Sequence, residues 1–327
     1  MKEVHPLMNM EACCGLFGIT RQAWYQHQKY EGQQALEHEV VLKTVREFRK
    51  DQPKVGVRKL CLHLVEPLLR HGIGIGRDAL FDLLRGRDML IRRRKRKHIT
   101  TDSNHPYRKY PNLIKEFIPL KANELWVSDI TYIDTKEGFM YLSLITDAYS
   151  HKIVGWHLGE TLETKGSMLA LNMALAQRTK KHPLIHHSDR GVQYCSYDYT
   201  NLLNHPKNQI KISMTENGDP YENAMAERVN GILKDEFLPA LLDSKQHAKE
   251  LIRQSTKTYN EVRLHTSINF MTPQQAHLNE GLLTKKWKPK TRNRPHPSEA
   301  NVKPSPPQEQ GQTLRVFGKK SPPSFVG

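Results

Sequence analysis

Three strand-like stretches follow one another between residues 125 and 159, and they constrain the fold more than any other feature of the chain. They read LWVSDITYI, FMYLSLITDAYS and KIVGWHLG. Their β-branched and aromatic residues are enriched in strands because such side chains pack well on a pleated, half-buried surface. Tyr149-Ser150-His151 separates the second stretch from the third and is typical of a turn. This pattern predicts a sheet in which consecutive strands are antiparallel neighbours.

Helical and strand patterns alternate in the rest of this region. The stretch TKGSMLALNMALAQRTK places Met168, Leu171 and Leu175 on one helical face, and LIHHSD and IKISMT are two further short strands. Two more helices are predicted in ENAMAERVNGILKDEF and SKQHAKELIRQSTKTYNEVR. This order of strands and helices indicates an α/β fold with a mixed five-stranded sheet and flanking helices, which we assign to residues 123–284.

Two all-α segments precede this core. Residues 1–35 contain a short apolar stretch, Gly18, and a second stretch that opens with Thr20 as a helix N-cap, a pattern typical of a helix-turn-helix. Residues 36–98 show apolar side chains at helical spacing and form a second helical module, which we expect to bind DNA. The glycines of its HGIGIG stretch lack a preceding strand and a following Gly-Lys-Ser/Thr, so we expect a turn rather than a nucleotide-binding loop.

Positive charge indicates the kind of partner that the chain binds. It has 50 Lys and Arg residues against 34 Asp and Glu, a formal net charge of +16. An excess of this size favours polyanionic partners, and ribosomal and other RNA-binding proteins share it. Six consecutive cations end the second helical module: Arg92, Arg93, Arg94, Lys95, Arg96 and Lys97. Because they cannot neutralise one another, we expect them to contact DNA phosphates, the alternative being a solubilising linker.

The remaining segments are a linker and a tail. Residues 99–122 form a linker that contains HPYRKYPN. Residues 285–327 hold 8 of the 19 prolines and 10 Lys or Arg residues against two Glu, which predicts a disordered basic tail. No apolar run approaches the roughly 18 residues of a membrane span, and the N-terminus lacks the apolar stretch of a secretion signal. The four cysteines form no CxxC pair, so we expect free thiols in a cytoplasmic, nucleoid-associated protein without membrane contact.

Three carboxylates fall where α/β proteins expose chemistry. Asp129 lies inside the first strand, Asp189 ends the strand LIHHSD before an Arg-Gly turn, and Glu227 lies on the helix predicted in ENAMAERVNGILKDEF. A charged side chain inside a strand is costly to desolvate without a partner. Oxygen donors suit a hard cation such as Mg²⁺, and two such ions roughly 4 Å apart can activate an attacking hydroxyl and stabilise a leaving oxygen. A cap, a buried ion pair or a solvated helix face explains each carboxylate taken alone.

Four motifs carry a resemblance to a known family. WVSDITYI, DAYSHKIVGW, HHSDRGVQY and NAMAERVNGILKDEF together resemble the catalytic core of retroviral-integrase-like transposases, the DDE group, and most closely the OrfB-type proteins of the insertion-sequence-three group. The resemblance runs from about residue 10 to about residue 280 and includes a helix-turn-helix region before the core. It implies a ribonuclease-H-like fold and a site in which Asp129, Asp189 and Glu227 hold Mg²⁺ or Mn²⁺, with two ions per active site.

The resemblance also implies DNA contacts beside the three carboxylates. The family tends to carry a basic residue seven positions after the glutamate, which here is Lys234. Seven residues are about two helical turns, so we expect Lys234 to share the face of Glu227 and to contact the DNA end, unless it is an ordinary solvated lysine. Arg190, which follows Asp189, is a further expected DNA contact.

The sequence departs from the family in one interval and contains rival site residues. The interval between Asp189 and Glu227 holds 37 residues, slightly more than is usual, and we attribute the excess to the loop NHPKNQ. Glu216 and Glu222 are rival third carboxylates, but they lack the AxxxRxNGxxK context of Glu227. We expect no structural zinc, because the nearby candidates lack zinc-ligand spacing; these are His182, His186, His187 and Cys195. We expect His187 instead to orient Asp189 or to approach the DNA.

The activity implied by the resemblance is metal-dependent cleavage and transfer of DNA strands at the ends of an insertion sequence. Water first frees a 3′-hydroxyl, which then attacks a second phosphodiester, while the protein positions the strands and neutralises charge. The expected partners are element ends and target DNA, further copies of the chain in a homo-multimer, and the product of an upstream overlapping frame. Two alternatives stay open, namely a non-catalytic DNA-binding regulator and a structure-selective nuclease on the same fold.

Overall fold

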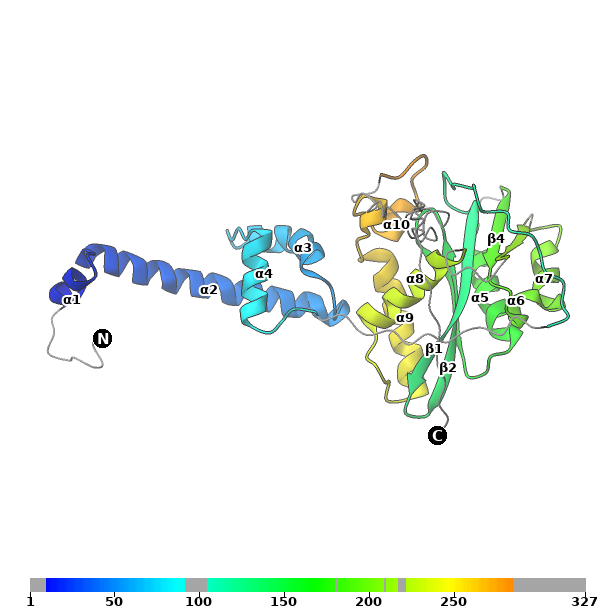
Figure 1. Ribbon diagram of the computed structural model, residues 1–327, viewed down its shortest axis with the longest axis horizontal. Coiled ribbons are helices and arrows are strands. Elements are labelled where there is room, and N and C mark those ends of the chain that lie inside the picture. Colours follow the sequence, from blue (N-terminus) through cyan, green and yellow to red (C-terminus); the bar gives the residue numbers. More distant parts are fainter. Residues whose placement is uncertain (1–9, 92–104, 180–181, 209, 217–221, 285–327) are drawn as a thin grey trace, which may run out of the picture. The chain divides into compact units, whose positions relative to one another are not determined.

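The computed structural model describes residues 10–91, 105–179, 182–208, 210–216 and 222–284 of the chain (Figure 1). The basic run 92–97 and the tail 285–327 lie outside these ranges, so the DNA contacts expected of the first and the disorder expected of the second stay predictions. Within the described ranges, no helix is both long enough and apolar enough to cross a membrane.

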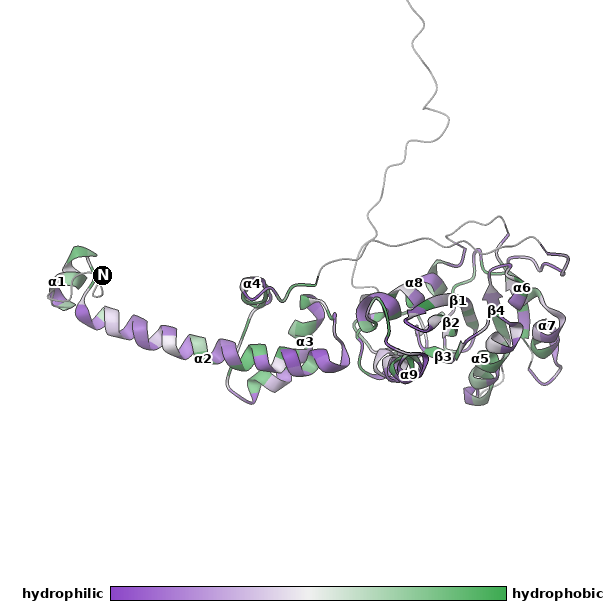
Figure 2. Ribbon diagram, turned by 90° about the horizontal axis from the view of Figure 1, so that it is seen from below, coloured by the Kyte–Doolittle hydropathy of each residue, from purple (hydrophilic) through white to green (hydrophobic). Residues whose placement is uncertain are grey.

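Four helices precede the sheet: α1 (Met10–Leu16), α2 (Arg21–Asp51), α3 (Val57–Leu69) and α4 (Arg77–Gly86). The expected N-cap at Thr20 is present, since its hydroxyl accepts a hydrogen bond from the backbone N–H of Ala23 at 3.1 Å. The helix α2 has 31 residues and runs across the boundary between residues 35 and 36 that the sequence pattern suggested. Residues 19–36 are exposed throughout, and Figure 2 shows the first half of α2 as mostly hydrophilic.

The second half of α2 belongs to a small helical core. Its apolar side chains pack against α3 and α4, and the fully buried residues of this cluster include Leu42, Val45, Leu60, Leu80 and Leu84. The helical spacing of apolar residues in the region 36–98 is therefore explained by packing between these three helices. The first half of α2 has no such partner in the described part of the chain.

The sheet is built from β1 (Leu125–Thr135), β2 (Gly138–Asp147), β3 (Ile153–Gly159), β4 (Leu184–Ser188) and β5 (Ile210–Met214). The order across the sheet is β3-β2-β1-β4-β5. The pairs β1–β2 and β2–β3 are antiparallel, whereas β1–β4 and β4–β5 are parallel. The mixed five-stranded sheet and the α/β class are therefore confirmed.

Helices cover both faces of this sheet (Figure 1). One face is packed by α5 (Thr164–Gln177), α6 (Val192–Cys195) and α7 (Tyr197–Asn204). The other is packed by α8 (Ala224–Ile232), the π-helical turn η1 (Leu233–Phe237) and α9 (Lys245–Glu261), and the short η2 (Thr266–Ile268) and α10 (Pro273–Ala276) follow.

Side chains alternate along β1, and this alternation positions the candidate site. Ile133 packs in the cluster that contains Val229 and Leu233, whereas Ile130 packs in the cluster of the α5 face. Because residues two apart in a strand share a face, Asp129 lies on the side of Ile133 and therefore faces α8 and η1.

Candidate active site

Asp129 and Asp189 occupy equivalent positions on two neighbouring parallel strands. The register pairs Val127 of β1 with His187 of β4, so the next residues on the same face are Asp129 and Asp189. Paired strands lie about 4.8 Å apart. The sheet itself therefore brings these two carboxylates side by side, at the point where β4 ends.

The carboxylate of Asp129 is destabilised by its surroundings. Burial is the largest cause, and together with the negative fields of Asp189 and Glu227 it raises the pKa of Asp129 to about 7. Two hydrogen bonds oppose this rise: the side-chain N–H of Asn230 donates to Oδ2 at 2.8 Å, and the backbone N–H of Ile130 donates to Oδ1 at 2.9 Å. The site therefore concentrates negative charge, and the two hydrogen bonds compensate that charge only in part.

Asp189 is held by the turn that follows β4. Its Oδ1 accepts a hydrogen bond from the backbone N–H of Gly191 at 3.1 Å. The carbonyl oxygen of Arg190 accepts a hydrogen bond from Nε2 of His105 at 2.7 Å. The turn is therefore fixed from two sides, once by its own carboxylate and once by the segment that precedes β1.

Glu227 lies in the first turn of α8, and its side chain is exposed. The start of this helix is tied to β1, because Nδ2 of Asn223 donates to the carbonyl oxygen of Ser128 at 3.1 Å. The field of Glu227 nevertheless raises the pKa of Asp129 less than that of Asp189 does. In the part of the chain that the structure describes, no three Asp, Glu, His or Cys side chains are gathered closely enough to hold a metal ion. The structure therefore brings Asp129 and Asp189 together and leaves Glu227 at the margin.

Asn230 is a site residue that the sequence interpretation missed. Its side chain is 4% exposed, and its Nδ2 makes the 2.8 Å hydrogen bond to Asp129. Its Oδ1 is buried without a hydrogen-bond partner in the described part of the chain. Asn230 lies three residues after Glu227, on the helical face that meets the sheet, and this spacing was the one available signal.

Lys234 lies beyond the end of the α-helix that carries Glu227. The residue lies in η1, where the backbone winds as a π-helix. Its Nζ donates to the carbonyl oxygen of Tyr132 at 2.8 Å and lies 3.4 Å from the hydroxyl of Thr131. The ammonium group therefore binds the backbone of β1, and its expected contact with a DNA end stays a prediction.

The turn η1 is held by an ion pair between a half-buried glutamate and a buried arginine. Both carboxylate oxygens of Glu236 accept hydrogen bonds from the guanidinium of Arg263, at 2.8 and 2.6 Å. Arg263 is 4% exposed and lies just after α9. The ion pair therefore connects the end of α9 to the turn that carries Lys234.

The two rival carboxylates have structural partners. Glu216 accepts hydrogen bonds from the backbone N–H of Asn112 at 3.1 Å and from Nζ of Lys115 at 2.5 Å. Glu222 accepts from Nδ2 of Asn112 at 3.1 Å and from the backbone N–H of Glu216 at 2.6 Å. Both side chains therefore attach the segment before β1 to the end of β5.

The two adjacent histidines of β4 belong to the core. Burial lowers the pKa of His186 to about 3 and that of His187 to about 4, so both rings are neutral near pH 7. Nε2 of His186 is hydrogen-bonded to the hydroxyl of Tyr199 at 3.0 Å, and Nδ1 of His187 to that of Ser213 at 2.8 Å. The structure thus places His187 against Ser213, and its expected action on Asp189 or DNA stays a prediction.

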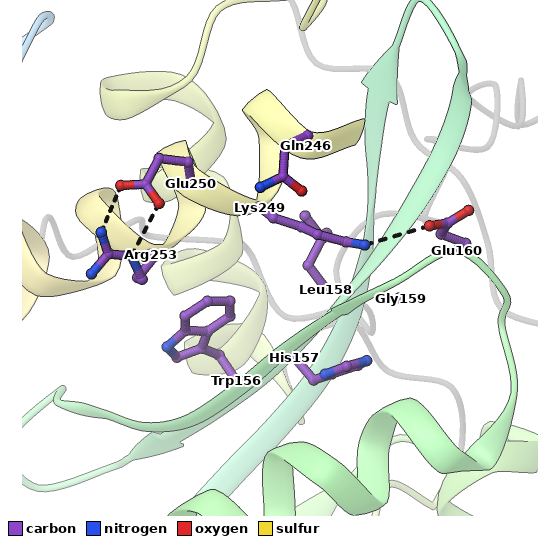
Figure 3. Close-up of a pocket in the computed structure, with 9 residues that line it drawn as sticks. All are labelled: Trp156, His157, Leu158, Gly159, Glu160, Gln246, Lys249, Glu250 and Arg253. Atoms are coloured by element: carbon purple, nitrogen blue, oxygen red, sulfur yellow. Dashed lines mark hydrogen bonds and ion pairs between the residues drawn. The ribbon is translucent and has the colours of Figure 1, made fainter. Parts of the chain in front are cut away.

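A groove between β3 and α9 contains none of the site residues discussed so far (Figure 3). It has a volume of about 580 Å³ and carries the ion pairs Lys249–Glu160 and Arg253–Glu250. Its lining consists of Trp156, His157, Leu158, Gly159, Glu160, Gln246, Lys249, Glu250 and Arg253. The alternating charges explain it as an ordinary solvated junction between a strand and a helix.

Known proteins share the core and most of the rest of the chain. Two models of the family described as integrase core domain match residues 119–220 and 208–273. An insertion element IS600 uncharacterized 31 kDa protein of Shigella sonnei is 34% identical over 266 residues, which cover 80% of this chain and 95% of that protein. The transposase for insertion sequence element IS629, also of Shigella sonnei, is 33% identical, covering 68% of each chain. Transposase InsF for insertion sequence IS3A of Escherichia coli strain K12 is 32% identical over 170 residues, 50% of this chain and 57% of that one.

These matches confirm the expected integrase-like core, with its two strand carboxylates inside the matched range. The identity also extends along most of the length of two insertion-element proteins, which confirms the expected resemblance to insertion-sequence transposases. The chain belongs to the transposases of bacterial insertion sequences, in the insertion-sequence-three group.

Proposed function

We propose that the chain cleaves and joins DNA strands at the ends of an insertion sequence, with Asp129, Asp189 and Glu227 as its metal-binding carboxylates. Membership in the transposase family makes it an enzyme of DNA transposition, a polynucleotidyl transferase. The observation that carries the assignment is that Asp129 and Asp189 each lie two residues after a pair of partners on neighbouring strands, Val127 and His187, in a site where the pKa of Asp129 is raised to about 7. Such uncompensated negative charge favours binding of a cation.

The donor set fits a divalent cation by its chemistry. All three candidate ligands are carboxylates, which Mg²⁺ and Mn²⁺ prefer. When bound, two such ions supply charge stabilisation for the attacking and leaving oxygens of a phosphodiester. Glu227 is exposed at the margin of the pair, so we infer that its side chain rotates toward Asp129 and Asp189 to complete the site. Two ions per site, rather than one, is part of the proposal.

The chain's own contribution is to hold the carboxylates in place before DNA arrives. Asn230 and the backbone of Ile130 fix both oxygens of Asp129, and the backbone of Gly191 fixes Asp189. In the proposed reaction, water attacks the phosphorus atom at the element end, and the bond between phosphorus and the 3′ oxygen of the element breaks. The element strand leaves with a 3′-hydroxyl, and the flanking strand keeps a 5′-phosphate. That hydroxyl then attacks a target phosphodiester without a covalent enzyme intermediate. Groups that are already oriented raise the rate because less entropy is lost in reaching the transition state.

The remaining partners follow from this function. We infer that α1–α4 recognise the element ends, that several copies of the chain assemble on DNA, and that the product of an upstream overlapping frame takes part. Because the proposed substrate is DNA, we infer that this protein acts in the cytoplasm, in association with the nucleoid. Short inverted repeats on both sides of the reading frame, and a small overlapping frame upstream, are the genomic observations that support these inferences.

Substitution of the carboxylates tests the proposed function. We expect Asp189→Asn and Glu227→Gln to bind element-end DNA as the wild type does, but to lose cleavage and joining in Mg²⁺ by about 100-fold or more. Asp243→Asn is a suitable control, because Asp243 is exposed and, among the described residues, pairs with Lys136 and His247 on the surface. Unchanged joining by Asp189→Asn would refute the assigned site and favour a DNA-binding regulator. Cleavage of branched DNA by the wild type without any joining would favour a structure-selective nuclease.

A further inference from the structure

The segment before β1 is fastened to the rim of the candidate site, although the sequence indicated only a linker. We call residues 105–115 the strap. Its first described residue, His105, donates to the carbonyl oxygen of Arg190 at 2.7 Å, directly after Asp189. Further along, the carbonyl oxygen of Pro111 accepts a hydrogen bond from the backbone N–H of Met214 at 3.3 Å. The strap is therefore held at two points, one beside a candidate catalytic carboxylate and one on the outer edge of β5.

The second attachment is extensive. The backbone N–H of Leu113 donates to the hydroxyl of Ser213 at 2.9 Å, next to the hydrogen bond between Pro111 and Met214. Asn112 and Lys115 add the contacts with Glu216 and Glu222 already described. These contacts fix residues 111–115 along β5, so the strap loses little further conformational freedom when it binds a partner.

Between the two attachments the strap presents cations and aromatic rings. Arg108 and Lys109 are both exposed. The guanidinium of Arg108 lies 5.0 Å from the ring centre of Tyr110, a distance at which the ring attracts a cation. The ring of Tyr107 packs edge-on against Tyr197, with 5.5 Å between centres, and Tyr197 is 69% exposed. A large aromatic side chain so exposed is available to a partner.

The charges of the strap act on the same region as the candidate catalytic carboxylate. Burial raises the pKa of the Cys195 thiol to about 11, and the negative field of Asp189 adds to this rise. The fields of Lys109 and Arg190 oppose it. The fields of Lys109 and Asp189 therefore both reach Cys195 of α6. The hydrogen bond from His105 to Arg190 is the contact that holds the strap, and with it Lys109, beside Asp189.

We propose that the strap is a DNA-binding surface, in which Arg108 and Lys109 contact the phosphate backbone of a duplex beside the site of strand transfer. Guanidinium and ammonium groups are the usual partners of phosphate oxygens, and contacts of this kind set the register of a duplex on a protein without reading its sequence. Tyr197 packs against the same duplex. The inference rests on the proposed function for the location of the reacting strands. The element end and the target duplex share this backbone chemistry.

The test is the salt dependence of DNA binding by the full chain. Binding of a fluorescent element-end duplex and of an unrelated target duplex is measured in EDTA over a range of salt concentrations. Each phosphate contact contributes about 0.9 to the slope of log K against log salt, so Arg108→Ala/Lys109→Ala should reduce the slope by about 2 for at least one duplex. At about 0.1 M salt its affinity should fall roughly tenfold or more.

A matched control removes the same charge elsewhere. Lys207 and Lys211 are exposed, and they lie at the opposite end of the sheet from Asp189, because β5 begins beside Leu184 and ends beside Ser188. Lys207→Ala/Lys211→Ala should leave the slope unchanged. The exchange Arg108→Lys/Lys109→Arg preserves the charge and should therefore keep the wild-type slope of log K against log salt.

The outcomes separate this inference from the proposed function. A slope that falls for only one duplex identifies which DNA the strap holds. An unchanged slope for both duplexes, or an equal loss in the control, overturns the inference even if the wild type cleaves and joins DNA. A wild type that does neither in Mg²⁺, combined with a reduced slope for the strap variant, overturns strand transfer and leaves the strap as a DNA-binding surface.

Discussion

The candidate site has a strand half and a helix half, which are held in different ways. In the strand half, Asp129 and Asp189 are placed by sheet register, so the backbone hydrogen bonds between β1 and β4 set the spacing of the residues that carry the two carboxylates. In the helix half, Glu227 and Lys234 depend on side-chain ties from α8 and η1 to β1. A register cannot slip without turning a whole strand over, whereas a side-chain tie can break singly. The comparison teaches that the strand half is preformed and that the helix half is the adjustable part.

The largest expected effect comes from releasing the helix half. Arg263→Met should lower the free energy of unfolding by about 3 kcal/mol, because it leaves the half-buried Glu236 without its main partner. Lys59, 3.5 Å from Glu236, keeps the loss at the lower end of the usual range. Urea unfolding followed by circular dichroism measures the change. The double variant Arg263→Met/Glu236→Met should recover part of the lost stability, and failure to do so would show that Arg263 acts by packing rather than by charge.

The strand half is tested by the response of stability to metal. At 100 times its dissociation constant, Mg²⁺ should stabilise the wild type by about 2.7 kcal/mol, and Asp189→Asn should abolish most of this gain. Without metal, Asp189→Asn should melt slightly above the wild type, because removal of a like charge lowers the raised pKa of Asp129. The sign follows from linkage: an acid whose pKa is higher in the folded state destabilises the fold once pH rises above its unfolded value. Thermal melts at pH 8 with EDTA and with Mg²⁺ make the comparison.

Asn230 joins the two halves, since it lies on α8 and binds Asp129. Asn230→Ala should reduce strand joining by about 10-fold to 100-fold, the usual result of removing a residue that orients a metal ligand. The measurement is the rate of joining at saturating Mg²⁺ and DNA. Asn230→Asp tests the same contact by charge, because a further carboxylate beside Asp129 should be at least as harmful. Full activity in Asn230→Ala would mean that the backbone of Ile130 orients Asp129 without help.

The smallest effect is expected at Lys234. Lys234→Gln should lower the free energy of unfolding by about 1 kcal/mol, because the carbonyl oxygen of Tyr132 loses a charged donor. Affinity for element-end DNA should change little if the ammonium group stays on β1. The contrary result, weaker binding of the DNA end without a change in stability, would mean that Lys234 leaves β1 to contact DNA, as the sequence predicted.

The strands, the class of the fold and the candidates Asp129 and Asp189 follow from local pattern and motif, since alternation and composition depend on neighbours in sequence. The side-by-side placement of these two residues could not be predicted in the same way, because it depends on a parallel pairing between strands sixty residues apart. The π-turn η1 contains Glu236, whose partner Arg263 is 27 residues away in sequence, so its setting is likewise tertiary. A helical wheel, which assumes α-helical winding, could therefore not give the position of Lys234.

The parts that the sequence interpretation missed are tertiary in origin. Asn230 became a site residue only because α8 lies against β1. The strap looked like a linker because its hydrogen bonds reach residues 190, 213 and 214, which no local pattern reveals. The motif around Glu227 ranked Glu216 and Glu222 behind it as third carboxylates. The same motif could not show that both side chains bind Asn112.

The strap also has a consequence for the solution behaviour of shortened chains. It covers the outer edge of β5, which would otherwise present unpaired backbone groups to any other strand. The opposite edge, β3, is flanked instead by charged side chains of the groove in Figure 3. A catalytic core that began only at β1 would expose the unpaired edge of β5 and would tend to aggregate. A soluble core fragment therefore has to include the strap residues that cover β5, Pro111 to Leu113.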